Sequence, residues 1–177
     1  AVGMDIDHFY GVLMEDRAIR TDLFAPQFTA EIKQVMATTK LPFIIKGVLS
    51  LSDAEKAVQL GASAIVVSNH GSGSLEFGLP SMVALPEIVE AVGNRVTVLV
   101  DTGFETGNDV FKGLALGAKA VGLASPVILA WCADGAQGVE LLINQVTAEM
   151  QRTMAATGCA NVAAINGGII RELPFTM

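Results

Sequence analysis

The chain has 177 residues, of which 51% are hydrophobic and 16% charged, and its formal net charge is −7. This length is typical of one domain, and the composition provides for a sizeable core without the charged or low-complexity runs of disordered segments. The negative charge argues against a nucleic-acid partner, which needs a basic face, and against binding to an anionic membrane surface.

Five short apolar runs predict buried strands. They are too short for helices, and the three central runs are rich in β-branched residues, as in parallel sheets. The polar ends of these three, Lys46, Ser68 and Asp101, lie 22 and then 33 residues apart, a spacing that suits β–α units. In chain order the predicted strands are Val2–Asp7, which is the weakest candidate, Pro42–Lys46, Ala64–Ser68, Val96–Asp101 and Ala120–Leu123.

Helix signals fall between these strands. Ser52 and Glu55 predict a capping box, and Gly61 predicts the end of the same helix. Pro86, inside a later periodic segment, predicts a kink or a new helix start. The predicted helices are Ala30–Ala37, a helix from Ser52 to Gly61, Ser81–Val92, Thr106–Leu116, Pro126–Ala133 and Gly135–Ala156, before a less regular tail from Thr157 to Met177 that packs against the rim of the fold.

The alternation of strands and helices predicts an α/β fold with a parallel sheet. Eight such units close a TIM (β/α)8 barrel, which usually takes about 250 residues, whereas five strands at most are present here. A doubly wound open sheet is the competing architecture, but no GxGxxG follows the first strand. The chain begins at Ala1, without an initiator Met, and enters a strand at once, so we expect a segment upstream.

The sequence also bears on the location of the protein. No apolar run reaches the roughly 18 residues of a membrane span, since the longest candidate is Ala120–Ala133, and we expect no membrane partner. Ala1–His8 carries two aspartates and does not resemble a signal peptide. Cys132 and Cys159 lack CxxC spacing, which predicts reduced thiols in a cytoplasmic protein. Cys132 lies in an apolar stretch and is expected in the core.

Polar residues gather at the predicted carboxyl ends of the strands, where parallel α/β proteins place their functional sites. Each would cost several kcal/mol, by order of magnitude, if buried without a partner, so their presence favours a site. In strand order these residues are Asp5, Asp7 and His8, then Lys46, then Ser68, Asn69 and His70, then Asp101 and Thr102, and finally Ser125.

Three segments carry a family resemblance. Leu41–Val48 reads LPFIIKGV, Val66–Gly71 reads VVSNHG and Asp109–Ala118 reads DVFKGLALGA. In this order and spacing they resemble the FMN-dependent 2-hydroxy-acid oxidases and dehydrogenases, such as glycolate oxidase and lactate oxidase. The resemblance implies a TIM barrel of which this chain holds about strands four to eight. Residues 1–177 would then be the C-terminal part of a single FMN-binding domain.

The resemblance implies that His70 is the catalytic base and that Asp7 is the carboxylate paired with it. Histidine suits this role because its ordinary pKa lies near working pH, and a neighbouring aspartate orients the ring and stabilises its cation. From the residues alone, His70 is equally a hydrogen-bonded rim histidine, and Asp7 a solvated side chain beside Asp5.

The resemblance also implies flavin contacts. Lys46 matches a lysine at the N1/O2 edge of the flavin, where a cation stabilises the reduced form; the alternative is a strand-end lysine that reaches solvent. Gly107 and the start of its helix offer backbone N–H groups as a phosphate seat, unless the helix is simply capped. The expected FMN-binding residues are Lys46, Ser68, Asp101, Thr102, Gly103, Phe104, Glu105, Ala124 and Ser125.

The sequence departs from the family pattern at three places. Gly73 stands where the family has an arginine that grips the substrate carboxylate, and Ser125 stands where it has a phosphate arginine. Glu105 and Thr106 replace the arginines that follow the Asp101 segment. Since arginine–carboxylate pairs are strong contacts, a small 2-hydroxy acid lacks its obvious anchor.

Arg17 and Arg20, after the first strand, are the candidates to replace the missing substrate contact. The preferred hypothesis is an FMN-dependent oxidoreductase acting on a small molecule, either a 2-hydroxy acid or a related alcohol, with His70 as base. The alternatives are a non-catalytic half-barrel subunit, favoured by the missing arginine, and an FMN-dependent isomerase. Because a partial barrel leaves open strand edges, we expect either an N-terminal barrel half, a partner chain or a homo-oligomer.

Overall fold

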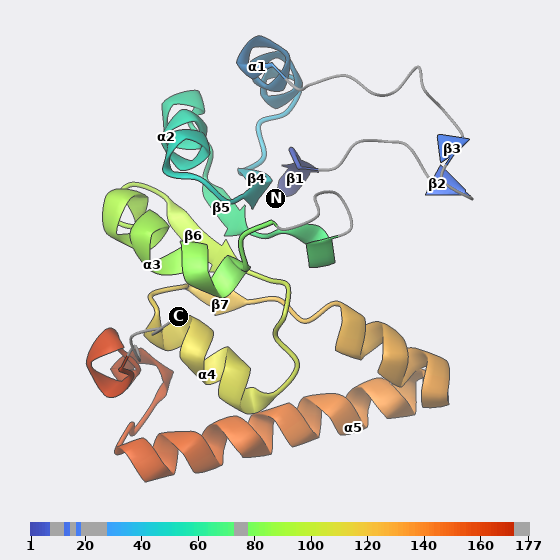
Figure 1. Ribbon diagram of the computed structural model, residues 1–177, viewed down its shortest axis with the longest axis vertical. Coiled ribbons are helices and arrows are strands. Elements are labelled where there is room, and N and C mark those ends of the chain that lie inside the picture. Colours follow the sequence, from blue (N-terminus) through green and yellow to red (C-terminus); the bar gives the residue numbers. More distant parts are fainter. Residues whose placement is uncertain (8–12, 15–16, 19–27, 73–77, 172–177) are drawn as a thin grey trace.

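The computed structural model describes residues 1–7, 13–14, 17–18, 28–72 and 78–171. At its centre is a parallel sheet of five strands in the order β1-β4-β5-β6-β7 (Figure 1). A separate antiparallel pair joins β2, Leu13–Met14, to β3, Arg17–Ala18. The strands of the parallel sheet are β1, Val2–Asp5; β4, Phe43–Val48; β5, Ala64–Val67; β6, Thr97–Val100; and β7, Ala120–Val121. All five lie within the predicted runs or overlap them.

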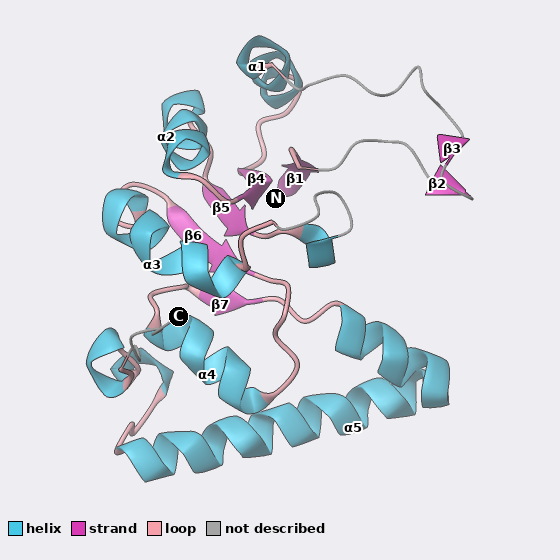
Figure 2. Cartoon of the chain, viewed as in Figure 1, coloured by secondary structure: helices cyan, strands magenta, loops and turns pink. Residues whose placement is uncertain are grey.

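The strand order distinguishes between the two architectures that the sequence left open. Apart from the short β2–β3 pair, each strand lies beside the next one along the chain, without the reversal that defines a doubly wound sheet. Right-handed crossovers in such an order place the helices on one side of the sheet. Figure 2 shows α1, α2 and α3 along one side of the strands. The fold is therefore an α/β parallel sheet consistent with part of a barrel.

Five helices follow from the predicted periodic segments: α1, Thr29–Ala37; α2, Leu51–Leu60; α3, Ser81–Val92; α4, Gly107–Ala115; and α5, Ser125–Thr157. The core lies between the sheet and this helix layer. Ile45 and Ile65 of the strands are at most 2% exposed and pack in one cluster with Leu85 and Ile88 of α3. Burial of each such side chain stabilises the fold by about 1.5–3 kcal/mol.

The start of α2 differs from the prediction. Its N-cap is Ser50, whose Oγ accepts a hydrogen bond from the backbone N–H of Asp53 at 3.1 Å, and Ser52 lies inside the helix. With Ser50 as the N-cap, Asp53 occupies the capping position, so Glu55 lies too far along the helix to close a capping box. Glu55 pairs instead with Arg95 in the turn after α3. Gly61 ends the helix in the left-handed conformation, as predicted.

The segment after β7 forms α5, which is interrupted at Asp134 and Gly135 by non-helical backbone angles. This break confirms the two predicted helices. Joined across the break, however, α5 contains an 18-residue stretch with a mean hydropathy of 1.3, long and apolar enough to cross a membrane. The sequence prediction missed this stretch because it treated the two parts separately. Length and composition alone are weak evidence of a membrane span.

Cys132, on α5, is exposed, so its predicted burial in the core is wrong. The periodic pattern was apolar, but α5 has no buried residue within the described part of the chain. Cys159 in the tail is buried instead. Together with Ile165 it packs against Phe111 and Ala115 of α4, which ties the tail to the helix layer.

Candidate active site

A pocket of about 860 Å³ lies at the carboxyl ends of the parallel strands. Its volume is within the range of small-molecule sites in proteins. The residues that line it come from five strand ends and from the starts of α3 and α5: Asp5, Lys46, Asn69, His70, Gly71, Pro80, Ser81, Met82, Asp101, Thr102, Gly103, Phe104, Glu105, Gly122, Ala124, Ser125 and Pro126. Nine of the predicted site residues are among them.

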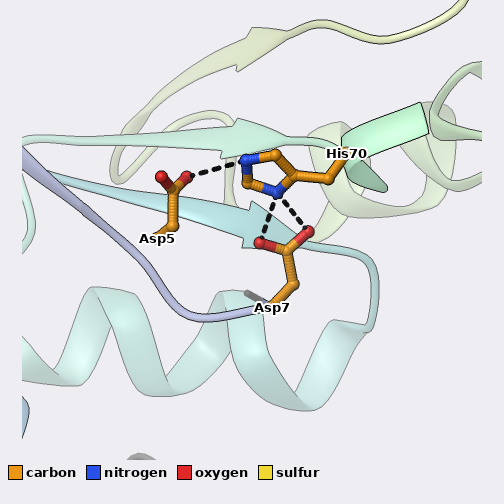
Figure 3. A group of neighbouring side chains, drawn as sticks. All are labelled: Asp5, Asp7 and His70. Atoms are coloured by element: carbon orange, nitrogen blue, oxygen red, sulfur yellow. Dashed lines mark hydrogen bonds and ion pairs between the residues drawn. The ribbon is translucent and has the colours of Figure 1, made fainter. Parts of the chain in front are cut away.

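His70 and Asp7 form a hydrogen-bonded pair, although 63 residues separate them in the chain (Figure 3). The Nδ1 atom of His70 lies 2.7 Å from Oδ1 and 2.8 Å from Oδ2 of Asp7. An ionised carboxylate can only accept hydrogen bonds, so Nδ1 carries the proton. In the neutral ring the Nε2 atom then holds the lone pair, which is the form that a general base requires.

The Nε2 atom of His70 faces a second group of charges. The Nζ atom of Lys46 lies 2.8 Å from it, and Oδ1 of Asp5 lies 3.5 Å from it, whereas Asp7 contacts Nδ1 (Figure 3). Lys46 also pairs with Asp5 at 3.2 Å and with Asp101 at 3.6 Å. Two carboxylates thus share the ammonium charge of Lys46 at the mouth of the sheet.

Asp5, Asp7 and His70 place three possible metal ligands within 4.8 Å of one another. The ammonium group of Lys46, however, lies close to both Asp5 and Nε2 of His70. A cation at this position competes directly with a metal ion for the same two ligands. The charge arrangement therefore fits a protein-supplied cation better than a metal centre.

Ser68 contacts Lys46, His70 and Thr102. It is fully buried, and its Oγ accepts hydrogen bonds from Nζ of Lys46 at 3.2 Å and from the backbone N–H of His70 at 3.3 Å. The same oxygen lies 3.3 Å from Oγ1 of Thr102. His70 and Thr102 have positive φ angles of 50° and 69°. Such backbone strain in non-glycine residues persists where the surroundings hold it, typically at functional sites.

The predicted phosphate seat at the start of α4 is wrong. The backbone N–H of Gly107 already donates to Oε2 of Glu149 at 2.8 Å, and those of Glu105 and Thr106 donate to Asp109 at 3.3 and 3.1 Å. A Cβ atom on Gly107 would lie 2.6 Å from the backbone nitrogen of Met150, so this glycine permits close packing of α4 on α5. Its hydrogen-bond partner comes from α5, which a local motif does not reveal.

Two carboxylates that accept hydrogen bonds from amides at the start of α4, those of Asp109 and of Glu149 from α5, have lowered pKa values. Hydrogen bonds from the side chain of Gln145 and from the backbone of Gly107 lower the pKa of Glu149. Partial burial raises the pKa of Asp109, but hydrogen bonds from Thr106 and Glu105 outweigh it, so the net pKa is below the ordinary value. Both carboxylates are thus ionised at neutral pH and repel a phosphate from these amides.

Other predicted residues lie around the pocket in different ways. Gly103 has a φ of 80° and no atom within 4 Å of where a Cβ would be, whereas Phe104 is 2% exposed and belongs to the core. No side chain caps the start of α5, and Ala124, Ser125 and Pro126 at this start line the pocket. Gly73 and Arg20 lie outside the described residues, as does the side chain of Arg17.

Asp5 and Asn69 were not assigned roles from the sequence. Asn69 accepts from the backbone N–H of Gly71 at 3.0 Å and donates to the carbonyl of Leu79 at 3.3 Å, which shapes the loop after His70. Asp5 and Asp7 alternate along one chain segment, and this i, i+2 spacing was the signal that both carboxylates face the same region.

Comparisons with known proteins agree with this geometry. A family model described as FMN-dependent dehydrogenase matches residues 11–172. The chain is 42% identical over 141 residues to the human protein named 2-Hydroxyacid oxidase 2, covering 80% of this chain and 40% of that protein. It is 39% identical over 147 residues to an L-lactate oxidase of Lactobacillus jensenii, covering 83% of this chain and 36% of the relative.

Among solved structures, a mandelate oxidase variant with a monooxide FMN adduct matches with a TM-score of 0.80 and 38% identity. The match covers 91% of this chain and 51% of that one. The chain therefore spans about 40% of the length of the curated relatives described above, and about half of this structural neighbour.

Proposed function

Because the chain belongs to the FMN-dependent dehydrogenase family, we propose that it forms part of a flavin-dependent oxidoreductase that oxidises a 2-hydroxy acid or a related alcohol. The observation that carries the proposal is the Asp7–His70 pair, which faces Lys46 in a pocket at the strand ends. The relatives named as oxidases of hydroxy acids support the substrate class.

His70 acts as the general base in this proposal. Asp7 holds the proton on Nδ1, so Nε2 is available to accept the proton of the substrate hydroxyl. The contact between Nε2 and Lys46 must open to admit that hydroxyl. Asp7 at Nδ1 and Asp5 near Nε2 then stabilise the positive imidazolium that forms. The ring therefore keeps its orientation throughout proton transfer.

The described residues fit a flavin at this pocket. Lys46 brings a cation and Ser68 and Thr102 bring hydroxyl groups to the strand ends, and the open side of Gly103 leaves room for a ligand to approach the backbone. The backbone N–H of Ser125, at the start of α5 that no side chain caps, is the proposed donor to the phosphate. FMN, when bound, supplies the acceptor for the substrate hydrogen and its two electrons.

The residue that binds the substrate carboxylate is also a proposal. Among the described residues that line the pocket, Lys46 is the sole lysine or arginine, and its charge is shared with Asp5 and Asp101. A substrate carboxylate therefore needs a cation from outside this lining. We propose Arg17 or Arg20 for this contact, because both follow β1 in the chain.

We further propose that the five strands correspond to strands four to eight of a TIM barrel and that residues 1–177 are the C-terminal part of its domain. The missing strands come from the rest of the protein, a partner chain or another copy. The absence of an arginine in the described lining also favours the second candidate, a half-barrel subunit without oxidase activity.

Anaerobic mixing of the FMN-loaded protein with glycolate, lactate and mandelate tests the proposal. We expect at least one of them to bleach the flavin absorption band with formation of one equivalent of the 2-oxo acid. Bound flavin that no hydroxy acid or alcohol reduces would instead support the non-catalytic subunit. Failure to bind flavin at all would remove the oxidoreductase proposal.

A further inference from the structure

Gly47 follows Lys46 in β4 at an irregularity of the sheet. Lys46 pairs with Val66 and Val48 pairs with Val67, so Gly47 is an extra residue opposite one step of β5. Its φ is 90°, in the left-handed region, and the residue is buried. Bulges of this kind use glycine for its backbone freedom and often lie beside active sites, where they redirect neighbouring groups.

The side chain of Asp7 occupies the space that a side chain at position 47 would need. A Cβ atom built on Gly47 would lie 2.7 Å from Cβ of Asp7 and still nearer to its carboxyl group, distances that real side chains do not tolerate. The carboxylate of Asp7 thus packs directly on the backbone of β4. From this position it reaches Nδ1 of His70 at 2.7 Å. Any side chain at position 47 must push that carboxylate away.

A second pocket beside Gly47 could accept the Asp7 carboxylate if it were displaced. Asp7 and Gly47 both line this pocket of about 260 Å³, which also includes Asp53 and Lys56 and does not include His70. Rotation of Asp7 into this space separates it from the imidazole without requiring the sheet to unfold. The ammonium group of Lys56 is a suitable partner for it there.

We infer that Gly47 is a positioning residue that holds the Asp7–His70 pair together by leaving room for the carboxylate. This inference rests on the proposed function only for its kinetic consequence. Its structural content, which is the hydrogen bond between Asp7 and Nδ1, can be measured without turnover.

Gly61 provides a matched control. Its φ is 86°, nearly that of Gly47, but no atom lies within 4 Å of where its Cβ would be. Gly47→Ala and Gly61→Ala therefore impose the same left-handed strain on a residue with a side chain. They differ in whether the new methyl group meets Asp7.

Proton NMR of the assembled protein reads the hydrogen bond. The downfield Nδ1–H signal of His70 is assigned by its loss in His70→Ala. We expect Gly61→Ala to retain this signal and Gly47→Ala to lose it. If oxidation of a hydroxy acid is established, Gly47→Ala should also lower kcat by about the same factor as Asp7→Asn, with KM changed less than threefold. An Nδ1–H signal that persists in Gly47→Ala overturns the inference whatever the activity.

If Gly47→Ala alone does not fold, thermal unfolding in an Asp7→Gly background still tests the inference. Asp7→Gly removes both the carboxylate and its Cβ, so the clash disappears. We expect Gly47→Ala to lower Tm in the Asp7→Gly background by no more than Gly61→Ala does. An equally large loss of Tm with and without Asp7 would show that the methyl group clashes elsewhere, and the inference would be wrong.

Discussion

Replacement of Asp7 by asparagine isolates the charge of the carboxylate that holds His70. The amide has nearly the same shape, but it is neutral and can present either an acceptor or a donor to Nδ1. When the amide donates to Nδ1, the ring proton moves to Nε2, and the base loses its lone pair toward the substrate. The variant therefore weakens the base in two ways while it preserves packing.

The distances give the expected size of the effect. At the observed 2.7–2.8 Å, unit charges attract by about 6 kcal/mol at an effective dielectric constant of 20, which is an upper bound. The side chains are 17% and 25% exposed, so water screens part of this attraction. The net value of a hydrogen bond to a charged group is about 1.5–3 kcal/mol. We expect a loss of about 2–4 kcal/mol, or about 30- to 900-fold in kcat.

Rapid-mixing measurement of flavin reduction is the assay, because it reports the proton-transfer step without product release. Asp53→Asn is the matched control: it removes a carboxylate near the same second pocket but does not contact His70. We expect the control to stay within threefold of the parent protein. A rate for Asp7→Asn within that same range would refute the role assigned to the pair.

Three further results are expected. His70→Ala should lower turnover by about 10²–10⁴-fold while flavin stays bound, as judged by the absorption spectrum, and near-normal turnover would remove His70 from the mechanism. Lys46→Met should make bound flavin harder to reduce, because a cation near it is lost; an unchanged midpoint potential in a redox titration contradicts this role. In the described part of the chain, β1 pairs with β4 alone and β7 with β6 alone. Light scattering should therefore find no well-folded monomer of 18.4 kDa, and a cooperative melt from such a species would disprove the need for partner strands.

The local elements could be predicted because their causes lie close together in the chain. Three of the four residues of the apolar strand Ala64–Val67 are buried, and the left-handed Gly61 ends α2, as the sequence indicated. The same local reasoning failed at two helix starts. Ser50 rather than Ser52 is the N-cap of α2, which leaves Glu55 beyond the capping position, and Gly107 donates to the distant Glu149 rather than to a ligand.

The sequence by itself determined the alternation of strands and helices and the edge of the sheet at which Lys46, Ser68, His70 and Asp101 gather. Hydrophobic period and strand spacing are properties of neighbouring residues, so they can be read along the chain. Which side chains touch depends on strand register, and the bulge at Gly47 shifts that register by one residue. The family resemblance implied the pairing of Asp7 with His70, 63 residues away, but only the tertiary structure decided that the Asp7 carboxylate lies over Gly47.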